Sequence, residues 1–199
     1  MKMTRAEKNE ATTAALLRAA AEAFAVRGFE ATTMDEIAER VGLSKGALYY
    51  RYRTKEDLFL ALLDERCAAY AAQLDDLSSG GWEAFAAQFR DVVQEGTWPR
   101  LFFEFVSYAS RHPGARRRLA KRTRALRRSL QRAIERQAAH HETELPVPAA
   151  DIALAVNALA NGLALERVAD PRGVPDRAFF ELPALVFAGA LSGDRPGPA

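Results

Sequence analysis

Residues 32–58, TTMDEIAERVGLSKGALYYRYRTKEDL, decide the fold of this chain. Thr33 and Glu36 have the spacing of a capping box, in which each side chain bonds a free backbone N–H of the other residue, so a helix is predicted to begin here. Gly42 stands where a helix end favours a left-handed residue, and Ser44 can cap a second helix two residues later. Two short helices joined by a glycine-containing turn are typical of the helix-turn-helix, whose second helix enters the DNA major groove.

The second of these helices is basic and rich in tyrosine. Residues 45–55 contain four cations and no acid. Tyrosine hydroxyls can bond phosphates, and the rings can contact sugars or thymine methyl groups. Leu48 is the only obvious core anchor, whereas a purely structural helix of this length should bury more. The composition therefore predicts a helix that contacts DNA.

The run T-T-x-x-x-I-A-x-x-x-G-L-S-K-G-A-L-Y-x-x-Y-x-x-K-E-x-L resembles the DNA-binding signature of TetR/AcrR-type bacterial transcriptional regulators. The resemblance covers residues 8–64, and the rest of the chain matches only in its helix pattern. Tyr52 stands where the family usually has Phe, which keeps an aromatic anchor. The family often has His or another residue at the position of Arg51, so the resemblance leaves the base preference open.

This resemblance implies specific contacts to a near-palindromic DNA operator. It implies phosphate contacts by Thr33, Tyr49 and Lys55. It places at or near base edges the residues Lys45, Gly46, Ala47, Tyr50 and Arg51. Of these, Lys45 and Arg51 can donate hydrogen bonds to guanine.

Apolar residues at helical spacing predict an all-α fold of about nine helices, with no strand candidate. After a polar arm at residues 1–8, the first expected helix ends at residue 27, and the two short helices lie within 33–53. Six further helices are expected at 54–77, 82–95, 100–111, 113–139, 149–169 and 176–191. The expected domains are an arm and helix-turn-helix head at 1–53, an effector-binding and dimerisation domain at 54–192, and a disordered tail at 193–199. The helix that begins after Thr54 would connect two cores and transmit movement between them.

The aromatic residues of 82–108 can line an apolar cavity with few polar groups. Asn157 and Asn161 share one face of an apolar helix, where they need a ligand, a second subunit or local backbone as partners. The predicted effector set is Phe85, Phe89, Trp98, Phe102, Phe103, Phe105, Tyr108, Asn157 and Asn161. None of these side chains is placed for chemistry, so the ligand is expected to be an effector and not a substrate.

A two-fold homodimer is expected, because one such head makes too few contacts for specific binding and dimers bind two half-sites. The resemblance places the interface on the helices predicted at 149–169 and 176–191, packed as a four-helix bundle. The small or apolar residues that fit this interface are Ala155, Ala158, Leu159, Gly162, Leu163, Leu185 and Ala188.

Composition limits the other possibilities. The net charge of a 199-residue chain is only +2, so DNA binding must rest on local patches. The polar N-terminus does not resemble a signal peptide, and no stretch approaches the roughly 20 apolar residues of a membrane span. The single cysteine, Cys67, cannot form an internal disulfide and suits a reducing compartment, so a cytoplasmic protein is expected.

Several motifs admit a second interpretation. Residues 42–46 fit G-x-S-x-G, but a nucleophile elbow needs a preceding strand, whereas a helix is predicted here. His140 and His141 are adjacent in a predicted loop and do not define a metal site by themselves. Cys67 is interpreted as a buried small residue, with oxidation sensing as the alternative. The nine arginines of 113–139 are interpreted as solvated or ion-paired, with an acidic ligand or a second nucleic-acid surface as the alternative.

The sequence thus predicts a ligand-responsive DNA-binding transcriptional regulator, most simply a repressor released from its operator by a small, mostly apolar effector. The alternative is a DNA-associated architectural or interaction protein without an effector. No enzymatic activity, cofactor or metal is expected.

Overall fold

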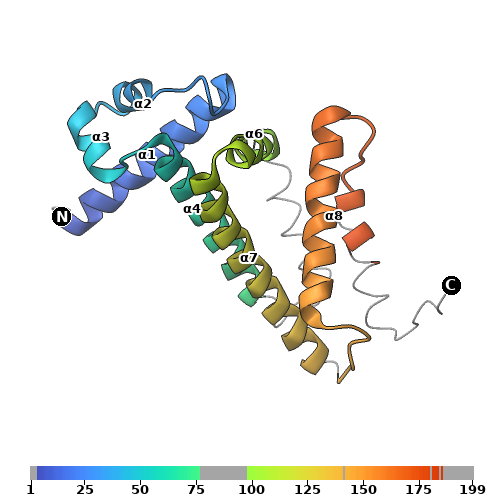
Figure 1. The fold of residues 1–199 in the computed structure, drawn as a ribbon. Coiled ribbons are helices and arrows are strands. Elements are labelled where there is room, and N and C mark those ends of the chain that lie inside the picture. Colours follow the sequence, from blue (N-terminus) through green and yellow to red (C-terminus); the bar gives the residue numbers. More distant parts are fainter. Residues whose placement is uncertain (1–3, 77–97, 141, 180, 184, 186–199) are drawn as a thin grey trace. The chain divides into compact units, whose positions relative to one another are not determined.

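The computed structural model describes residues 4–76, 98–140, 142–179, 181–183 and 185 (Figure 1). The all-α prediction is confirmed, and no strand occurs among these residues. The bounded helices are α1 (Arg5–Arg27), α2 (Met34–Arg40), α3 (Lys45–Arg51), α4 (Lys55–Asp76), α6 (Trp98–Arg111), α7 (Pro113–His140) and α8 (Ala149–Ala169). The helix predicted at 82–95 and the tail 193–199 lie outside the described residues.

One predicted helix begins earlier than expected, and another is only partly described. α1 begins at Arg5, within the predicted polar arm, because Thr4 and Glu7 form a capping box that starts the helix early. Of the helix predicted at 176–191, the structure describes helical residues at 178–179 and 181–183.

The chain divides into two compact units. Unit 1 comprises residues 1–66 and 100–119, and unit 2 comprises residues 67–99 and 120–199. The unit that carries the helix-turn-helix therefore extends past the predicted boundary at residue 53. The reason is that the first part of α4 and most of α6 share aromatic contacts with α1 and with Phe29, which follows α1.

Unit 1 is built around an aromatic cluster formed by Phe24, Phe29, Phe59, Phe105 and Tyr108. The four phenylalanines are almost completely buried. The ring of Phe59 stacks on that of Phe105 with centroids 4.0 Å apart, and Phe29 meets Phe105 edge-on at 5.0 Å. Fully burying one such side chain contributes roughly 1.5–3 kcal/mol, so α6 is a structural part of this unit.

Among the described residues of unit 2, a hydrophobic core lies between α7 and α8. Leu130 and Ile134 of α7 pack with Ile152 and Val156 of α8, and Phe179 closes the cluster. α8 buries only this face. Among the described helices it alone is long and apolar enough to cross a membrane by length and composition.

Candidate nucleic-acid interface

The helix-turn-helix forms through local hydrogen bonds that the sequence predicted. The hydroxyl of Thr33 accepts a hydrogen bond from the backbone N–H of Glu36. In return, the carboxylate of Glu36 accepts a hydrogen bond of 3.0 Å from the backbone N–H of Thr33. This backbone hydrogen bond holds the pKa of Glu36 below its ordinary value. Gly42 has a φ of +66°, the left-handed conformation expected after α2. Ser44 caps α3 by accepting from the backbone N–H of Ala47 at 3.2 Å.

The outer side of α3 is open to a partner. Leu48 is completely buried and anchors the helix, whereas Tyr50 is 91% exposed. We call the exposed residues Lys45, Gly46, Tyr49 and Tyr50 of α3 the reading face. Gly46 and Tyr50 are four residues apart and lie on the side of α3 away from Leu48. Ala47 is also exposed, on the flank of this face. No atom lies within 4 Å of a Cβ built at Gly46, so DNA could approach the backbone there.

Lys45 is held by a neighbouring helix in the free protein. Its ammonium lies 2.5 Å from the carboxylate of Asp35 on α2, and this hydrogen bond raises the pKa of Lys45. Both side chains are exposed, and exposed ion pairs contribute little to stability. Contact between Lys45 and a base would therefore cost little to arrange.

Arg51 lies against α1 and not on the reading face. Its guanidinium donates to the hydroxyl of Thr13, the side-chain amide oxygen of Asn9, and the backbone carbonyl of Asn9. We call these contacts the Arg51 clamp. The sequence predicted a base contact for Arg51 and gave no sign of the clamp, since its partners lie about 40 positions away on another helix.

Lys55 also has partners within the protein. Its ammonium donates to the backbone carbonyls of Glu30 and Thr32 at 2.7 and 2.9 Å, and lies 4.8 Å from the centre of the Phe29 ring. Partial burial lowers the pKa of Lys55. Lys55 thus holds the loop between α1 and α2, while its predicted phosphate contact stays a prediction. Thr33, the third predicted phosphate contact, is exposed at the start of α2.

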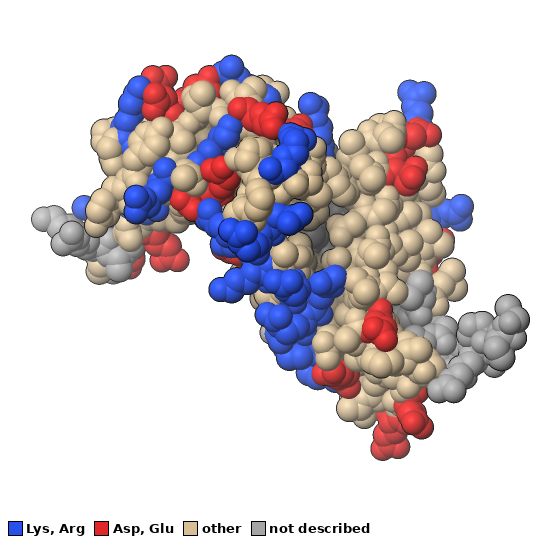
Figure 2. Space-filling model, in the orientation of Figure 1, with Lys and Arg blue, Asp and Glu red and all other residues tan. Residues whose placement is uncertain are grey.

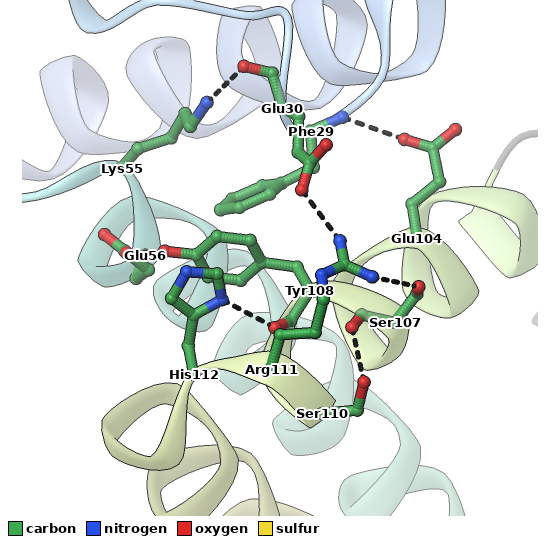
Figure 3. A network of polar contacts seen from close by, with 10 residues as sticks. All are labelled: Phe29, Glu30, Lys55, Glu56, Glu104, Ser107, Tyr108, Ser110, Arg111 and His112. Carbon is green, nitrogen blue, oxygen red and sulfur yellow. Dashed lines mark hydrogen bonds and ion pairs between the residues drawn. The ribbon is translucent and has the colours of Figure 1, made fainter.

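α6 holds the same loop from another side (Figure 3). The carboxylate of Glu104 accepts a hydrogen bond of 2.9 Å from the backbone N–H of Phe29. This approach requires glycine at position 28, because a Cβ there would lie 2.7 Å from a carboxylate oxygen of Glu104 and φ is +81°. Arg111 of α6 bonds the carboxylate of Glu30 at 3.0 Å.

Tyr108 of α6 completes this network at the start of α4. Its hydroxyl donates to the carboxylate of Glu56, and this hydrogen bond raises the pKa of Tyr108 to about 12. Its ring also packs on Phe29 in the aromatic cluster. The sequence did not reveal these roles, since Glu104 and Tyr108 act on residues more than 50 positions away.

The predicted effector residues are distributed over both units. Phe105 and Tyr108 belong to the aromatic cluster of unit 1, where Phe105 is fully buried and Tyr108 half-buried, and their contact with an effector stays a prediction. Phe102 and Phe103 are half-buried on α6 and meet edge-on with centroids 5.8 Å apart. Trp98, Asn157 and Asn161 belong to unit 2 and are half-buried. Phe85 and Phe89 lie outside the described residues.

The predicted dimer residues are mostly exposed. Ala155, Ala158 and Gly162 are exposed on the face of α8 away from its core, and Leu185 is exposed further along the chain. Leu159 is half-buried, and Leu163 packs against the core of its own unit. Ala188 lies outside the described residues. Sequence reasoning missed three large exposed hydrophobic residues of α8, namely Leu154, Leu165 and Val168.

The structure bears on three of the motifs with a second interpretation. Cys67, expected to be buried, is half-buried. Ser44 of the G-x-S-x-G match caps α3 after a helix and a turn. Among the described residues, no group of three or more His, Cys, Asp or Glu side chains could hold a metal ion.

Two regions of the sequence match known families. Residues 16–62 match bacterial regulatory proteins of the tetR family, and residues 83–182 match the C-terminal region of BetI-type transcriptional repressors. This chain belongs to the TetR family. TetR-family proteins are transcription regulators with a helix-turn-helix and are not enzymes, so the exposed side of α3 belongs to a DNA-binding element.

Similar proteins agree with this membership. The transcriptional activator FasR of Mycolicibacterium smegmatis is 36% identical over 95 residues, which cover 48% of this chain and 40% of FasR. The A-factor receptor protein of Streptomyces griseus is 33% identical over 104 residues, covering 49% of this chain and 37% of that protein. The chain thus matches less than half the length of these relatives. Salmonella enterica GusR shares the fold, with a TM-score of 0.76 at 22% identity over 96% of this chain and all of GusR.

Proposed function

We propose that this TetR-family regulator is a repressor that binds a near-palindromic operator as a homodimer and leaves it when a small, mostly apolar effector binds. The observation that carries the proposal is the double role of α6. One face of α6 holds the DNA-binding head, and the same helix carries aromatic side chains that the head does not use. The match to BetI-type repressors over residues 83–182 supports repression.

The DNA contact would use the reading face of α3. Tyr49 and Tyr50 would contact phosphates, sugars or thymine methyl groups, and Lys45 could leave Asp35 to donate to a base. The open space over Gly46 supports close approach of the helix to the groove. Arg51 would act chiefly through its clamp, by fixing the orientation of α3 on α1.

Homodimerisation would cover the apolar face of α8. Leu154 and Leu165 are about half exposed, and the small residues Ala158 and Gly162 lie on the same side of the helix. Small residues allow a second helix to approach closely, and large exposed apolar patches mark interaction sites. Two heads joined in this way could occupy half-sites about 34–36 Å apart, or a multiple of that distance.

Release by an effector would pass through α6. Phe103 is two residues before Phe105 and therefore points away from the aromatic cluster, to a side of α6 where a ligand could contact it. On the head side, Glu104, Tyr108 and Arg111 hold Phe29, Glu56 and Glu30. A ligand that binds better to a shifted α6 would move the loop before α2 and the start of α4. It can do so only by its difference in affinity between the two states.

The experiment is a footprint on the DNA beside the protein's own gene, with and without hydrophobic metabolites selected by a thermal-shift screen. We expect a protected near-palindrome that becomes accessible when one metabolite is added. In vitro transcription from the same promoter should fall with protein and recover with that metabolite. Increased transcription would contradict repression, and protection unaffected by any ligand that binds would favour an architectural protein.

A further inference from the structure

α7 carries a line of cations on the side away from its core. Lys121, Arg124, Arg128 and Arg132 are exposed and recur at intervals of three or four residues, so they share one face of the helix. We call these four residues the α7 stripe. Figure 2 shows Lys and Arg side chains gathered along α7. All four belong to unit 2 and lie outside the helix-turn-helix.

Ion pairs among the described residues do not account for the stripe. Lys121, Arg124 and Arg128 form no ion pair with any described residue, and Arg132 donates only to the hydroxyl of Ser129, at 2.9 Å. Glu135 is the only acid on α7, against ten Lys and Arg, and its carboxylate accepts from the side-chain amide of Gln131.

The stripe opposes the stability of its own helix. Like charges three or four residues apart on a helix repel each other, and the stripe contains three consecutive pairs of this kind. The first turn of α7 also lacks an acid that would interact favourably with the helix dipole. An external anion would relieve this repulsion, so the stripe fits a binding surface better than a stabilising one.

The length and charge of the stripe favour a partner that is an extended polyanion and that binds without apolar contacts. At a rise of 1.5 Å per residue, residues 121–132 extend over roughly 16 Å, which exceeds the size of a single small anion. Protein partners are generally anchored by aromatic or aliphatic side chains, yet none of the large exposed hydrophobic residues lies on α7. Arginine forks pair well with phosphate oxygens, and a phosphodiester backbone needs no apolar anchor.

We propose that the α7 stripe binds the phosphodiester backbone of double-stranded DNA without regard to sequence, as a contact separate from the reading face. This goes beyond the proposed function, because it needs neither an operator sequence nor an effector. The contact would add phosphate neutralisation, and hence salt dependence, to the binding of any duplex.

The test compares two variants with the same loss of charge. Arg124→Gln/Arg128→Gln removes half of the stripe, and Arg172→Gln/Arg177→Gln removes two exposed arginines of the same unit that lie outside it. Binding of the full-length protein to a random-sequence duplex is measured by fluorescence anisotropy between roughly 50 and 200 mM salt. The stripe variant should bind at least about tenfold more weakly at low salt. Its slope of log affinity against log salt should be smaller by about 1.8, that is about 0.9 for each phosphate that the variant no longer neutralises.

The control variant should behave as the parent does, and equal slopes and affinities for both variants would overturn the proposal. Thermal unfolding of the stripe variant and the parent shows whether a loss of binding reflects misfolding. Because the substitutions remove repulsion between like charges, the stripe variant should be at least as stable as the parent. A stripe variant that binds DNA normally but loses binding to polyglutamate would identify an acidic protein instead and overturn the proposal. Operator preference, measured in parallel, reports separately on the proposed function.

Discussion

The two compact units differ in where they keep their apolar side chains. In unit 1 the rings of α1, α4 and α6 meet inside one cluster, and the exposed tyrosines Tyr49 and Tyr50 carry hydroxyls suited to DNA. In unit 2 the helix α8 leaves Leu154, Leu165 and Val168 exposed. Unit 1 therefore has a core that is complete within one chain, whereas unit 2 has an apolar face that a second copy can cover.

The largest effect should follow from removing a ring of the aromatic cluster. Phe105→Ala would leave a cavity among Phe29 and Phe59 and should lower the free energy of unfolding by about 3–5 kcal/mol. Phe103→Ala, on the other side of the same helix, should cost clearly less. Urea unfolding measures both variants. Equal losses would show that α6 is not held to the head by this cluster.

Charges placed on the apolar face of α8 should break the dimer. Leu154→Glu/Leu165→Glu would bury two carboxylates in the interface and should weaken dimerisation by at least roughly 30-fold, equivalent to about 2 kcal/mol. Val26→Glu, at an exposed apolar position of unit 1, is the matched control and should leave the dimer intact. Sedimentation velocity over a range of concentrations distinguishes the outcomes. If the double variant remains dimeric, the dimer interface does not lie on this face of α8.

The Arg51 clamp should contribute to both stability and DNA binding. Arg51→Ala should lower the free energy of unfolding by about 1–3 kcal/mol, because its hydrogen bonds involve a charged group, and should weaken binding to all sequences alike. Asn9→Ala/Thr13→Ala should cause a similar loss, with little added when Arg51→Ala is combined with it. If Arg51→Ala instead relaxes the preference at one base pair and leaves stability unchanged, Arg51 reads a base.

These residues show which parts of the site the sequence could predict. Thr33, Glu36 and Ser44 act on residues three positions away, so their spacing alone was enough to place α2 and α3. Arg51, Lys55 and Glu104 bond partners 23 to 75 positions away, and their roles depend on how α1, α4 and α6 pack. The family resemblance and the chemistry of cations suggested DNA contacts for Arg51 and Lys55, because nothing local in the sequence marks the carbonyls that Lys55 bonds or the clamp of Arg51.

The smallest effect concerns the acid stability of unit 1. Partial burial raises the pKa of Glu56, but the hydrogen bonds from Tyr108, from the backbone and from Thr54 together outweigh burial, and the net pKa is lowered. A carboxyl with a lowered folded-state pKa stabilises the protein above its ordinary pKa, and this stability is lost as the pH falls below that value. Tyr108→Phe should therefore reduce the drop in unfolding temperature between about pH 5 and pH 3. Tyr49→Phe, on the exposed side of α3, should leave that drop unchanged.

In the proposed mechanism, effector binding and operator binding oppose each other. Calorimetric titration of the effector into free protein and into the protein–operator complex tests it most directly. Because coupling between two ligands is reciprocal, the operator should weaken effector binding by the same factor by which the effector weakens operator binding. Equal effector affinity in the two titrations would contradict the claim.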